Sequence, residues 1–372
     1  MRVVHVAPFY APVIGGVEEV VKRVAEYTAS RGYETYVVTY NRLRRGGYNT
    51  LPREEEINGV HVIRLKPDFA WSHGTYSSEL PQAIKALKPD IVHVHVWRHP
   101  HVFQVAKLKR ELRFKAILHG HAPFHKLSQL GPATWAYHRF VDAFGRSYLR
   151  LYDAYIALTP HEAGKVKKLG FCGNVSVVPH GVEEDQCTIG KSSEKRCQVL
   201  YLGRVSKSKN LDLLAEAMAH VARELSGAEL VIAGPDEGIA EKLLNRAKKG
   251  GVKARYLGQV SEGEKHKLYA ESAVYALPSL YEPFGITLLE AGIHETPAVI
   301  TGEGGQLYAA PPNVASLWAR PDPKRYARAI AALLTDEKLR GRLGVQAKEW
   351  ARQHDWRKIL PMYEKIYEQL AA

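Results

Sequence analysis

Residues 281–292 read YEPFGITLLEAG and place two glutamates, Glu282 and Glu290, on either side of a Pro, a Gly and an apolar run. If a helix begins at Phe284, Glu282 lies in the loop before it and Glu290 one to two turns inside it. Helical side chains lean back toward the N-terminus, so both carboxylates can serve one pocket. The first helical N–H groups favour a phosphate, and carboxylates accept hydrogen bonds from sugar hydroxyls. A capped amphipathic helix with two solvated glutamates is the alternative.

The composition is that of an ordinary globular chain. The 372 residues are 45% hydrophobic and 24% charged, enough for two domains with sizeable cores. The start, MRVVHVAPFYAP, lacks the apolar segment of a signal peptide, and no apolar run reaches the roughly 18 residues of a membrane span. Three widely spaced cysteines, Cys172, Cys187 and Cys197, fit a reduced compartment. We therefore expect a cytoplasmic protein.

The formal net charge of +13 indicates an anionic partner. Residues 1–190 hold 25 Lys and Arg against 17 Asp and Glu, so the basic excess leans toward the first half. A nucleic-acid-binding protein is one alternative. It would need a basic stripe with stacking aromatics, whereas the basic residues here are scattered. We expect no nucleic-acid partner.

Short β-rich runs alternate with helical periodicity along most of the chain. RVVHVA, DIVHVHV and KAILHG are examples from the first half, and VLYLG and ELVIAG from the second. Repeated βαβ units give parallel sheets covered by helices on both faces. The predicted fold is α/β, with two Rossmann-like, doubly wound domains facing each other across a cleft. We place the domains at residues 1–185 and 199–352, with a polar linker at 186–198 and a terminal helix within 353–372.

The loop after the first strand of the second domain, YLGRVSKSKNLD, contains Arg204 and Lys209. Ligands of open α/β sheets bind beyond the carboxyl ends of the strands. Two cations there can neutralise a diphosphate. No Asp-x-Asp occurs in the sequence, so the usual carboxylate pair for a metal–nucleotide complex is missing, and protein cations would carry the leaving group's charge. A solvated basic loop is the alternative.

Gly15 and Gly16 open a predicted helix after the first strand, in PFYAPVIGGVEEVVKR. Two glycines there let a ligand approach the backbone, and the helical N–H groups favour a phosphate. The spacing differs from that of a dinucleotide fingerprint, so a plain tight turn is an equal alternative when the stretch is taken alone.

Histidines are concentrated in the first half, where 13 of the 17 precede residue 181. Residues two apart on a strand share a face, so histidine pairs could chelate zinc with a carboxylate as third ligand, and a zinc-dependent hydrolase is the rival function. No acidic residue has ligand spacing to any pair, so we expect no metal. His119 is interpreted instead as a neutral hydrogen-bonding group at the cleft. The pairs are His93 with His95, His99 with His101, and His119 with His121.

Taken together, the motifs resemble those of retaining glycosyltransferases of the GT-B fold, family four. The glycine pair, the LH that ends a strand, VVPHGV, GRVSKSKN and EPFGITLLEAG occur in the family's order and cover nearly the whole chain. The resemblance implies a metal-independent hexosyltransferase that uses a UDP- or GDP-sugar and needs no cofactor. It also implies that the final helix, from about Trp356, crosses back to the first domain. His180 stands where the family often has Asn, and GGQLYAAPP lacks the family's Glu.

The resemblance also implies a role for each matching residue. Glu290 would hold the ribose and Glu282 the hexose. Further donor contacts would come from the amides of Phe284 and Gly285 to the hexose and of Ile286 and Thr287 to the diphosphate, from Arg204 and Lys209 to the diphosphate, from Gly15 and Gly16 to the phosphate from the other domain, and from His119 to the hexose near the reacting carbon.

Two basic, apolar stretches in the first domain, residues 103–115 and 135–152, suggest the acceptor. Cations among bulky apolar residues suit a helix resting on an anionic membrane. We therefore expect a carbohydrate or lipid-linked acceptor and peripheral contact with the inner face of the membrane. The alternative is that the apolar faces pack on the sheet. The cations are Lys107, Arg110, Arg139, Arg146 and Arg150.

Overall fold

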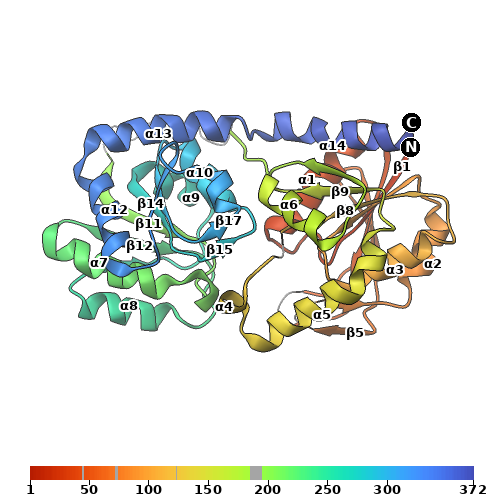
Figure 1. Ribbon diagram of the computed structural model, residues 1–372, viewed down its shortest axis with the longest axis horizontal. Helices are drawn as coiled ribbons and strands as arrows, with labels where there is room; N and C mark the ends of the chain where they lie inside the picture. The colour runs from red at the N-terminus through yellow and green to blue at the C-terminus, as the bar shows by residue number, and fades with distance from the viewer. Residues whose placement is uncertain (44–45, 72–73, 123, 185–194) are drawn as a thin grey trace. The chain divides into compact units, whose positions relative to one another are not determined.

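The computed structural model describes the chain except for residues 44–45, 72–73, 123 and 185–194, and it divides into two compact units (Figure 1). Unit 1 comprises Met1–His180 and Arg357–Ala372, and unit 2 comprises Gly181–Trp356. These division points differ from the predicted boundaries at 185 and 352. Val182 and Asp355, which pair in an isolated parallel bridge, both lie in unit 2.

Unit 1 is built on an eight-stranded sheet in the order β10-β9-β8-β7-β1-β2-β4-β3, and only the β3–β4 pair is antiparallel. A small antiparallel pair, β5 with β6, stands apart from it. The strands are β1 (Arg2–Val6), β2 (Glu34–Tyr40), β3 (Glu54–Ile57), β4 (Val60–Leu65), β5 (Phe69–Trp71), β6 (Gly74–Tyr76), β7 (Ile91–His95), β8 (Lys115–His119), β9 (Ala154–Ala157) and β10 (Asn174–Val177). The helices are α1 (Gly16–Ser30), α2 (Leu80–Leu87), α3 (Pro100–Leu108), α4 (Leu127–Leu130), α5 (Pro132–Leu149), α6 (Pro160–Leu169) and α14 (Trp356–Ala371).

Unit 2 is built on a six-stranded parallel sheet in the order β13-β12-β11-β14-β16-β18. The strands are β11 (Arg196–Leu202), β12 (Glu229–Ala233), β13 (Lys253–Tyr256), β14 (Ser272–Leu277), β15 (Tyr281–Glu282), β16 (Ala298–Ile300), β17 (Glu303–Gly304) and β18 (Ser316–Trp318). The helices are the 3-10 turn η1 (Lys207–Lys209), α7 (Leu211–Glu224), α8 (Ala240–Lys249), α9 (Glu262–Glu271), α10 (Ile286–Ile293), α11 (Gln306–Ala309), α12 (Pro323–Thr335) and α13 (Glu337–Arg352).

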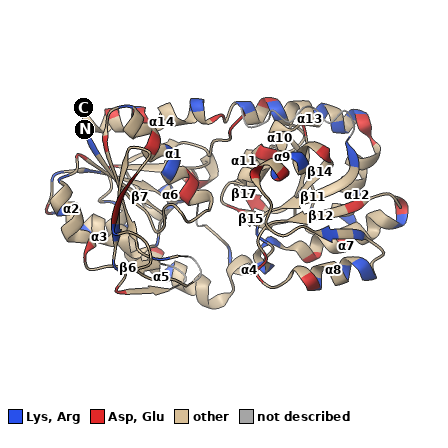
Figure 2. Cartoon of the chain, turned by 180° about the vertical axis from the view of Figure 1, so that it is seen from behind, with Lys and Arg blue, Asp and Glu red and all other residues tan. Residues whose placement is uncertain are grey.

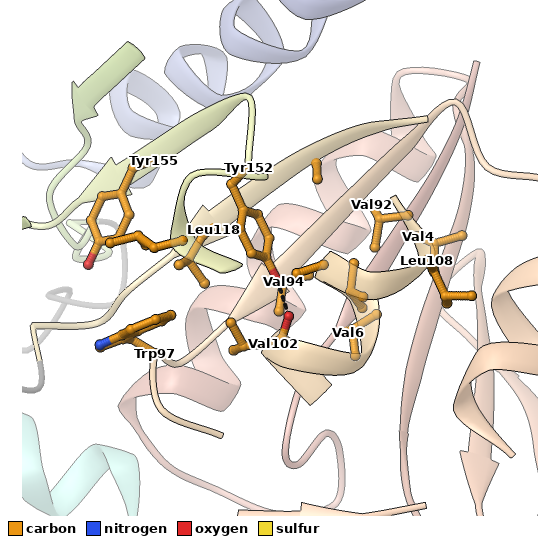
Figure 3. Close-up of a cluster of buried hydrophobic side chains, with 14 of the residues drawn as sticks. Val4, Val6, Val92, Val94, Trp97, Val102, Leu108, Leu118, Tyr152 and Tyr155 are labelled. Atoms are coloured by element: carbon orange, nitrogen blue, oxygen red, sulfur yellow. Dashed lines mark hydrogen bonds between the residues drawn. The ribbon is translucent and has the colours of Figure 1, made fainter. Parts of the chain in front are cut away.

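The strand alternation in unit 1 sends different residues to the two faces of the sheet. Val4 and Val6 of β1, with Val92 and Val94 of β7, belong to a hydrophobic cluster that also contains residues of α3 (Figure 3). Tyr152 closes this cluster, and its hydroxyl donates to the carbonyl of Val102 at 2.8 Å. Because successive side chains of a strand point to opposite faces, the two residues between these valines, His5 and His93, face the other way.

The strands predicted from the five quoted sequence runs are present, and so is the doubly wound α/β class. Two further boundaries differ from the prediction. Strand β11 begins at Arg196, so the end of the predicted linker is strand, while its residues 186–194 lie outside the described part. Helix α10 begins at Ile286 instead of Phe284, because Gly285 adopts a left-handed conformation with φ 96° and caps the helix.

The last helix, α14, belongs to unit 1. Its Glu364 accepts a hydrogen bond from the Tyr27 hydroxyl at 2.7 Å and forms an ion pair with Arg31 at 2.9 Å, both on or beside α1. These contacts hold the end of the chain against its beginning.

Charges of both signs are mixed along α8 and α13 (Figure 2). Among the described residues, no helix combines the length and the apolar character needed to cross a bilayer.

Candidate active site

The predicted donor residues of unit 2 lie in loops at the carboxyl edge of its sheet and in helix α10. From β11 the chain adds β12 and β13 toward one edge of the sheet, and from β14 it adds β16 and β18 toward the opposite edge. Strands β11 and β14 are neighbours at the centre. This arrangement is a topological switch point, where ligands of open α/β sheets bind. Arg204 and Lys209 follow β11, and Glu282 follows β14.

The Glu282 loop is held by a second loop that contains Gly304 and Gly305. Strands β15 and β17 pair Glu282 with Gly304, and the amide of Gly305 donates to the carbonyl of Glu282 at 2.8 Å. A Cβ at Gly305 would overlap the carbonyl oxygen of Pro283. Only glycine permits this close approach of the two backbones.

Lys209 and Glu282 form the central ion pair of the candidate site. The Lys209 Nζ lies 2.6 Å from the Glu282 Oε1, and the two side chains are only 19% and 9% exposed. Lys209 is positioned by η1 and by the next residue, Asn210, whose side-chain amide donates to the carbonyl of Pro278 at 3.1 Å. The two residues predicted to hold diphosphate and hexose are therefore in direct contact.

Glu290 lies on α10 with both carboxylate oxygens engaged. Lys265 Nζ donates to Oε1 and the Tyr269 hydroxyl donates to Oε2, each at 2.9 Å. Both partners lie on α9, and sequence reasoning missed them. The Glu290 side chain is 16% exposed, so it is oriented before any ligand binds.

The first turn of α10 is also fixed by a neighbouring strand. The Tyr275 hydroxyl of β14 contacts the Thr287 Oγ1 at 2.7 Å and donates to the carbonyl of Leu202 at 3.0 Å. Ile286 and Thr287 are the first two residues of the helix, where backbone N–H groups have no intrahelical acceptor. This turn is suited to an anion.

Arg204 is placed differently from Lys209. Its guanidinium forms an ion pair with Glu237 at 3.2 Å, and its side chain is 60% exposed. The structure therefore brings Lys209 into contact with Glu282, whereas Arg204, from the same loop, pairs with Glu237 at the surface.

Gln306, the first residue of α11, follows the second glycine pair, where the family's glutamate is missing. Its side chain is buried, and its Nε2 donates to the carbonyls of Ser279 at 3.0 Å and of Thr301. Gln306 thus ties the loop that holds the Glu282 backbone to the end of β14. A buried amide with this role is not visible in the sequence pattern.

Comparison with known proteins identifies the architecture. The family model Glycosyltransferase Family 4 matches residues 14–186, and the model Glycosyl transferases group 1 matches residues 183–350. The chain belongs to the family 4 glycosyltransferases of the GT-B fold.

Relatives of this glycosyltransferase span its whole length. An uncharacterised glycosyltransferase of Methanocaldococcus jannaschii is 27% identical, covering 99% of this chain and 98% of its own. The GDP-mannose:cellobiosyl-diphosphopolyprenol alpha-mannosyltransferase of Komagataeibacter xylinus is 24% identical, and the match covers 100% of this chain and 93% of the mannosyltransferase. The solved structure of sucrose-phosphate synthase from Thermosynechococcus elongatus superposes with a TM-score of 0.82 at 20% identity. The superposition covers 99% of this chain and 98% of the synthase, and it shows the fold alone.

In unit 1 of the glycosyltransferase, Gly15 and Gly16 lie where they were predicted. Helix α1 begins at Gly16 with Gly15 as its N-cap, and the amide of Glu19 donates to the Gly15 carbonyl at 2.9 Å. The first turn also carries Glu18 and Glu19. The phosphate role implied for the glycines stays a prediction.

The role interpreted for His119, a neutral hydrogen-bonding group at a cleft, stays a prediction. His119 is fully buried in unit 1 and stacks on His121, with ring centroids 3.9 Å apart. Burial lowers the pKa of His119 well below its usual value, so the ring is neutral, in agreement with the interpreted state. Tyr363 of α14, 5.9 Å away between ring centroids, lies over the same face, and its distance along the chain hid this burial from the sequence.

The zinc-hydrolase alternative finds no support. The two family models and the relatives named above are glycosyltransferases or synthases. His93, His95, His101 and His119 are all fully buried, where a hydrolytic substrate would not reach them.

Proposed function

We propose that this glycosyltransferase moves a hexose from a UDP- or GDP-sugar to a hydroxyl acceptor, with retention of anomeric configuration and without a metal. The observation that carries the proposal is the Lys209–Glu282 pair at 2.6 Å, with the N-cap of α10, Gly285, three residues after Glu282. A cation, a carboxylate and unpaired helical amides at one edge suit the diphosphate and the sugar of such a donor.

In this proposal each end of the donor has its own carboxylate. Glu290 accepts hydrogen bonds from the ribose and Glu282 from the hexose, while Lys209 and Arg204 stabilise the departing diphosphate. Backbone amides of the first turn of α10 add to that stabilisation. The acceptor oxygen attacks the face from which the diphosphate leaves, and a phosphate oxygen takes its proton. No side-chain nucleophile is required.

A panel of nucleotides tests the donor assignment. UDP, GDP, ADP and their sugars are added to the chain while its thermal unfolding is followed, because a ligand at 100 times its Kd stabilises by about 2.7 kcal/mol. We expect UDP or GDP to give the largest shift. Transfer measured during brief exposure to a chelator, with the product anomer assigned by NMR, tests metal independence and retention. An inverted product, or no shift with any nucleotide, would contradict the proposal.

We further propose a lipid-linked acceptor and contact with an anionic membrane through α5. Phe140 and Phe144 are 60% and 67% exposed, with ring centroids 4.4 Å apart, and Arg139 and Arg146 are exposed beside them. Exposed aromatics flanked by cations suit the interface of an anionic bilayer. One relative carries a diphosphopolyprenol acceptor in its name. On this basis we propose that the protein acts at the inner face of the membrane.

The other predicted membrane stretch, residues 103–115, does not share these features. Only its first part is helical, since α3 ends at Leu108 and β8 begins at Lys115. Val105 and Leu108 are buried in the hydrophobic cluster. For this stretch the packed alternative is correct, and the membrane proposal rests on α5.

A further inference from the structure

The small antiparallel hairpin of unit 1, β5 with β6, exposes aromatic side chains that the proposed transfer reaction does not use. Phe69 and Trp71 are 56% and 36% exposed, and Tyr76 is half-buried. Thr75, which points to the opposite face of the hairpin, is buried. The hairpin therefore turns its apolar face to solvent and a polar side chain to the protein, which is the reverse of an ordinary surface strand.

The three aromatic rings, Phe69, Trp71 and Tyr76, form one aromatic strip along this face. Phe69 is paired with Tyr76 across the two strands, and their ring centroids are 5.0 Å apart. Phe69 also stacks on Trp71, with ring centroids 5.6 Å apart, and in both pairs the ring planes differ by only 17°. Each ring holds its neighbour, so the strip is ordered before any ligand binds and loses little side-chain entropy on binding.

The body of unit 1 supports the hairpin from behind. Arg42 donates through Nη1 to the Thr75 hydroxyl at 2.7 Å. A Cβ at Gly74 would overlap the Cδ of Pro100, so β6 lies directly against the first residue of α3. These contacts fix the buried face of the hairpin and leave the aromatic strip on its outer face.

The hairpin stands on the ligand-binding side of the unit 1 sheet. It lies between the end of β4 at Leu65 and the start of α2 at Leu80, and β4 runs parallel to β2. It therefore follows the carboxyl end of a parallel strand, the side where open α/β sheets bind ligands. The Trp71 side chain also hydrogen-bonds Tyr137 of α5, and the hairpin lies beside α5 in both ribbon views (Figures 1 and 2).

Local charge distinguishes the aromatic strip from the membrane surface proposed on α5. Residues 66–79, which contain the hairpin, carry a formal charge of −1 from one lysine, one aspartate and one glutamate. Helix α5 carries +1 from two arginines and one aspartate. An anionic bilayer attracts α5 more than the hairpin. An uncharged sugar is not repelled by the hairpin, and the exposed carboxylate of Asp68 can accept hydrogen bonds from its hydroxyls.

We propose that the aromatic strip binds the carbohydrate part of the acceptor. The carbon-bound hydrogens of a pyranose ring are slightly positive, and they pack on the negative face of an aromatic ring. An acceptor whose lipid is held at α5 would present its sugar to the neighbouring hairpin. The inference rests on the proposed lipid-linked acceptor, and it gives the sugar of that acceptor a site of its own, separate from the donor loops of unit 2.

Binding of glycans and of vesicles by the full chain separates the two surfaces. Cellotetraose, maltotetraose and mannotetraose are titrated by NMR, and vesicles that contain anionic lipid but no carbohydrate are used in co-sedimentation. In the hairpin variant, Phe69→Ser with Trp71→Ser, affinity for the tetrasaccharide that binds the wild type should fall about tenfold, because two stacking rings are lost. Its vesicle binding should be unchanged.

Phe140→Ser with Phe144→Ser is the matched control, because it also removes two exposed aromatic rings from unit 1. This α5 variant should keep its glycan affinity and lose vesicle binding. A second readout needs no destabilising change. In the wild type, the bound tetrasaccharide should shift the NMR signal of the Trp71 indole N–H, which is assigned with Trp71→Phe.

The proposal is overturned if none of the three tetrasaccharides binds the wild type or shifts the Trp71 signal. It is also overturned if the hairpin and α5 variants have equal glycan affinities. Loss of vesicle binding in the hairpin variant, to the same extent as in the α5 variant, would make the strip part of the membrane surface instead. None of these readouts uses a nucleotide or measures transfer, so failure of the proposed reaction can be told apart from failure of this site.

Discussion

Replacing Lys209 with methionine would leave the Glu282 carboxylate buried without its cation. The pair is 2.6 Å long and its side chains are 19% and 9% exposed, so solvent cannot substitute for the ammonium group. Removing one partner of such a pair costs about 3–5 kcal/mol. That is a large share of the roughly 5–15 kcal/mol that stabilises a typical folded protein. Methionine keeps an apolar side chain of similar length, so the loss of stability reflects mainly the removal of the positive charge.

The double variant Lys209→Met with Glu282→Gln separates charge from packing. It removes the unpaired carboxylate, so we expect it to be more stable than Lys209→Met alone. Lys348→Met is the control, because the Lys348–Glu295 pair is 2.8 Å long but more exposed, at 24% and 32%. Such a pair contributes about 1 kcal/mol or less.

Urea unfolding followed by circular dichroism gives the free energy of unfolding of the three variants, provided that their m-values are unchanged. Steady-state kinetics gives the rate of transfer. Lys209→Met should also slow transfer by at least one to two decades, where each decade is about 1.4 kcal/mol. The reasoning fails if Lys209→Met is no less stable than Lys348→Met, or if the double variant is the least stable of the three.

Three further changes test the rest of the site and the membrane surface. Glu290→Ala should weaken UDP or GDP binding by about 1.5–3 kcal/mol in calorimetry, because the ribose loses a charged acceptor; unchanged affinity would remove Glu290 from the nucleotide site. Gly305→Ala should lower both donor affinity and the unfolding midpoint by displacing the neighbouring loop, whereas Gly227→Ala, where a Cβ meets nothing within 4 Å, should change neither. The pair Phe140→Ser and Phe144→Ser should reduce co-sedimentation with vesicles of graded anionic content, and wild-type binding that does not rise with anionic lipid at low salt would contradict the membrane proposal.

Local patterns in the sequence predicted the strands well because alternating β-rich runs and helical periodicity are properties of short segments. The two-residue strands β15 and β17 were not predicted, because two residues are too few to show an alternating pattern. Glu290 was selected from its spacing to Glu282, but Lys265 and Tyr269 were not, because they reach it from another helix.

His119 shows the same limit for burial. Its position at the end of a strand was correct, yet the cover over that face comes from α14, more than 200 residues later in the chain. The stacking of His119 on His121 depends likewise on a left-handed backbone conformation at His121, which spacing alone does not reveal.

The chain returns to unit 1 after unit 2, so unit 1 consists of two segments and unit 2 of one. The two units therefore differ in how easily each could be exchanged with that of a relative. Unit 2 is continuous, so the donor half of a relative could be grafted in by replacing one uninterrupted segment, Gly181–Trp356. Unit 1 cannot be moved in the same way, because a fragment that ends at His180 lacks α14 and loses the Tyr367 hydroxyl bonded to His93. A hybrid enzyme should therefore keep its own final helix with its own unit 1, whichever unit 2 is inserted between them.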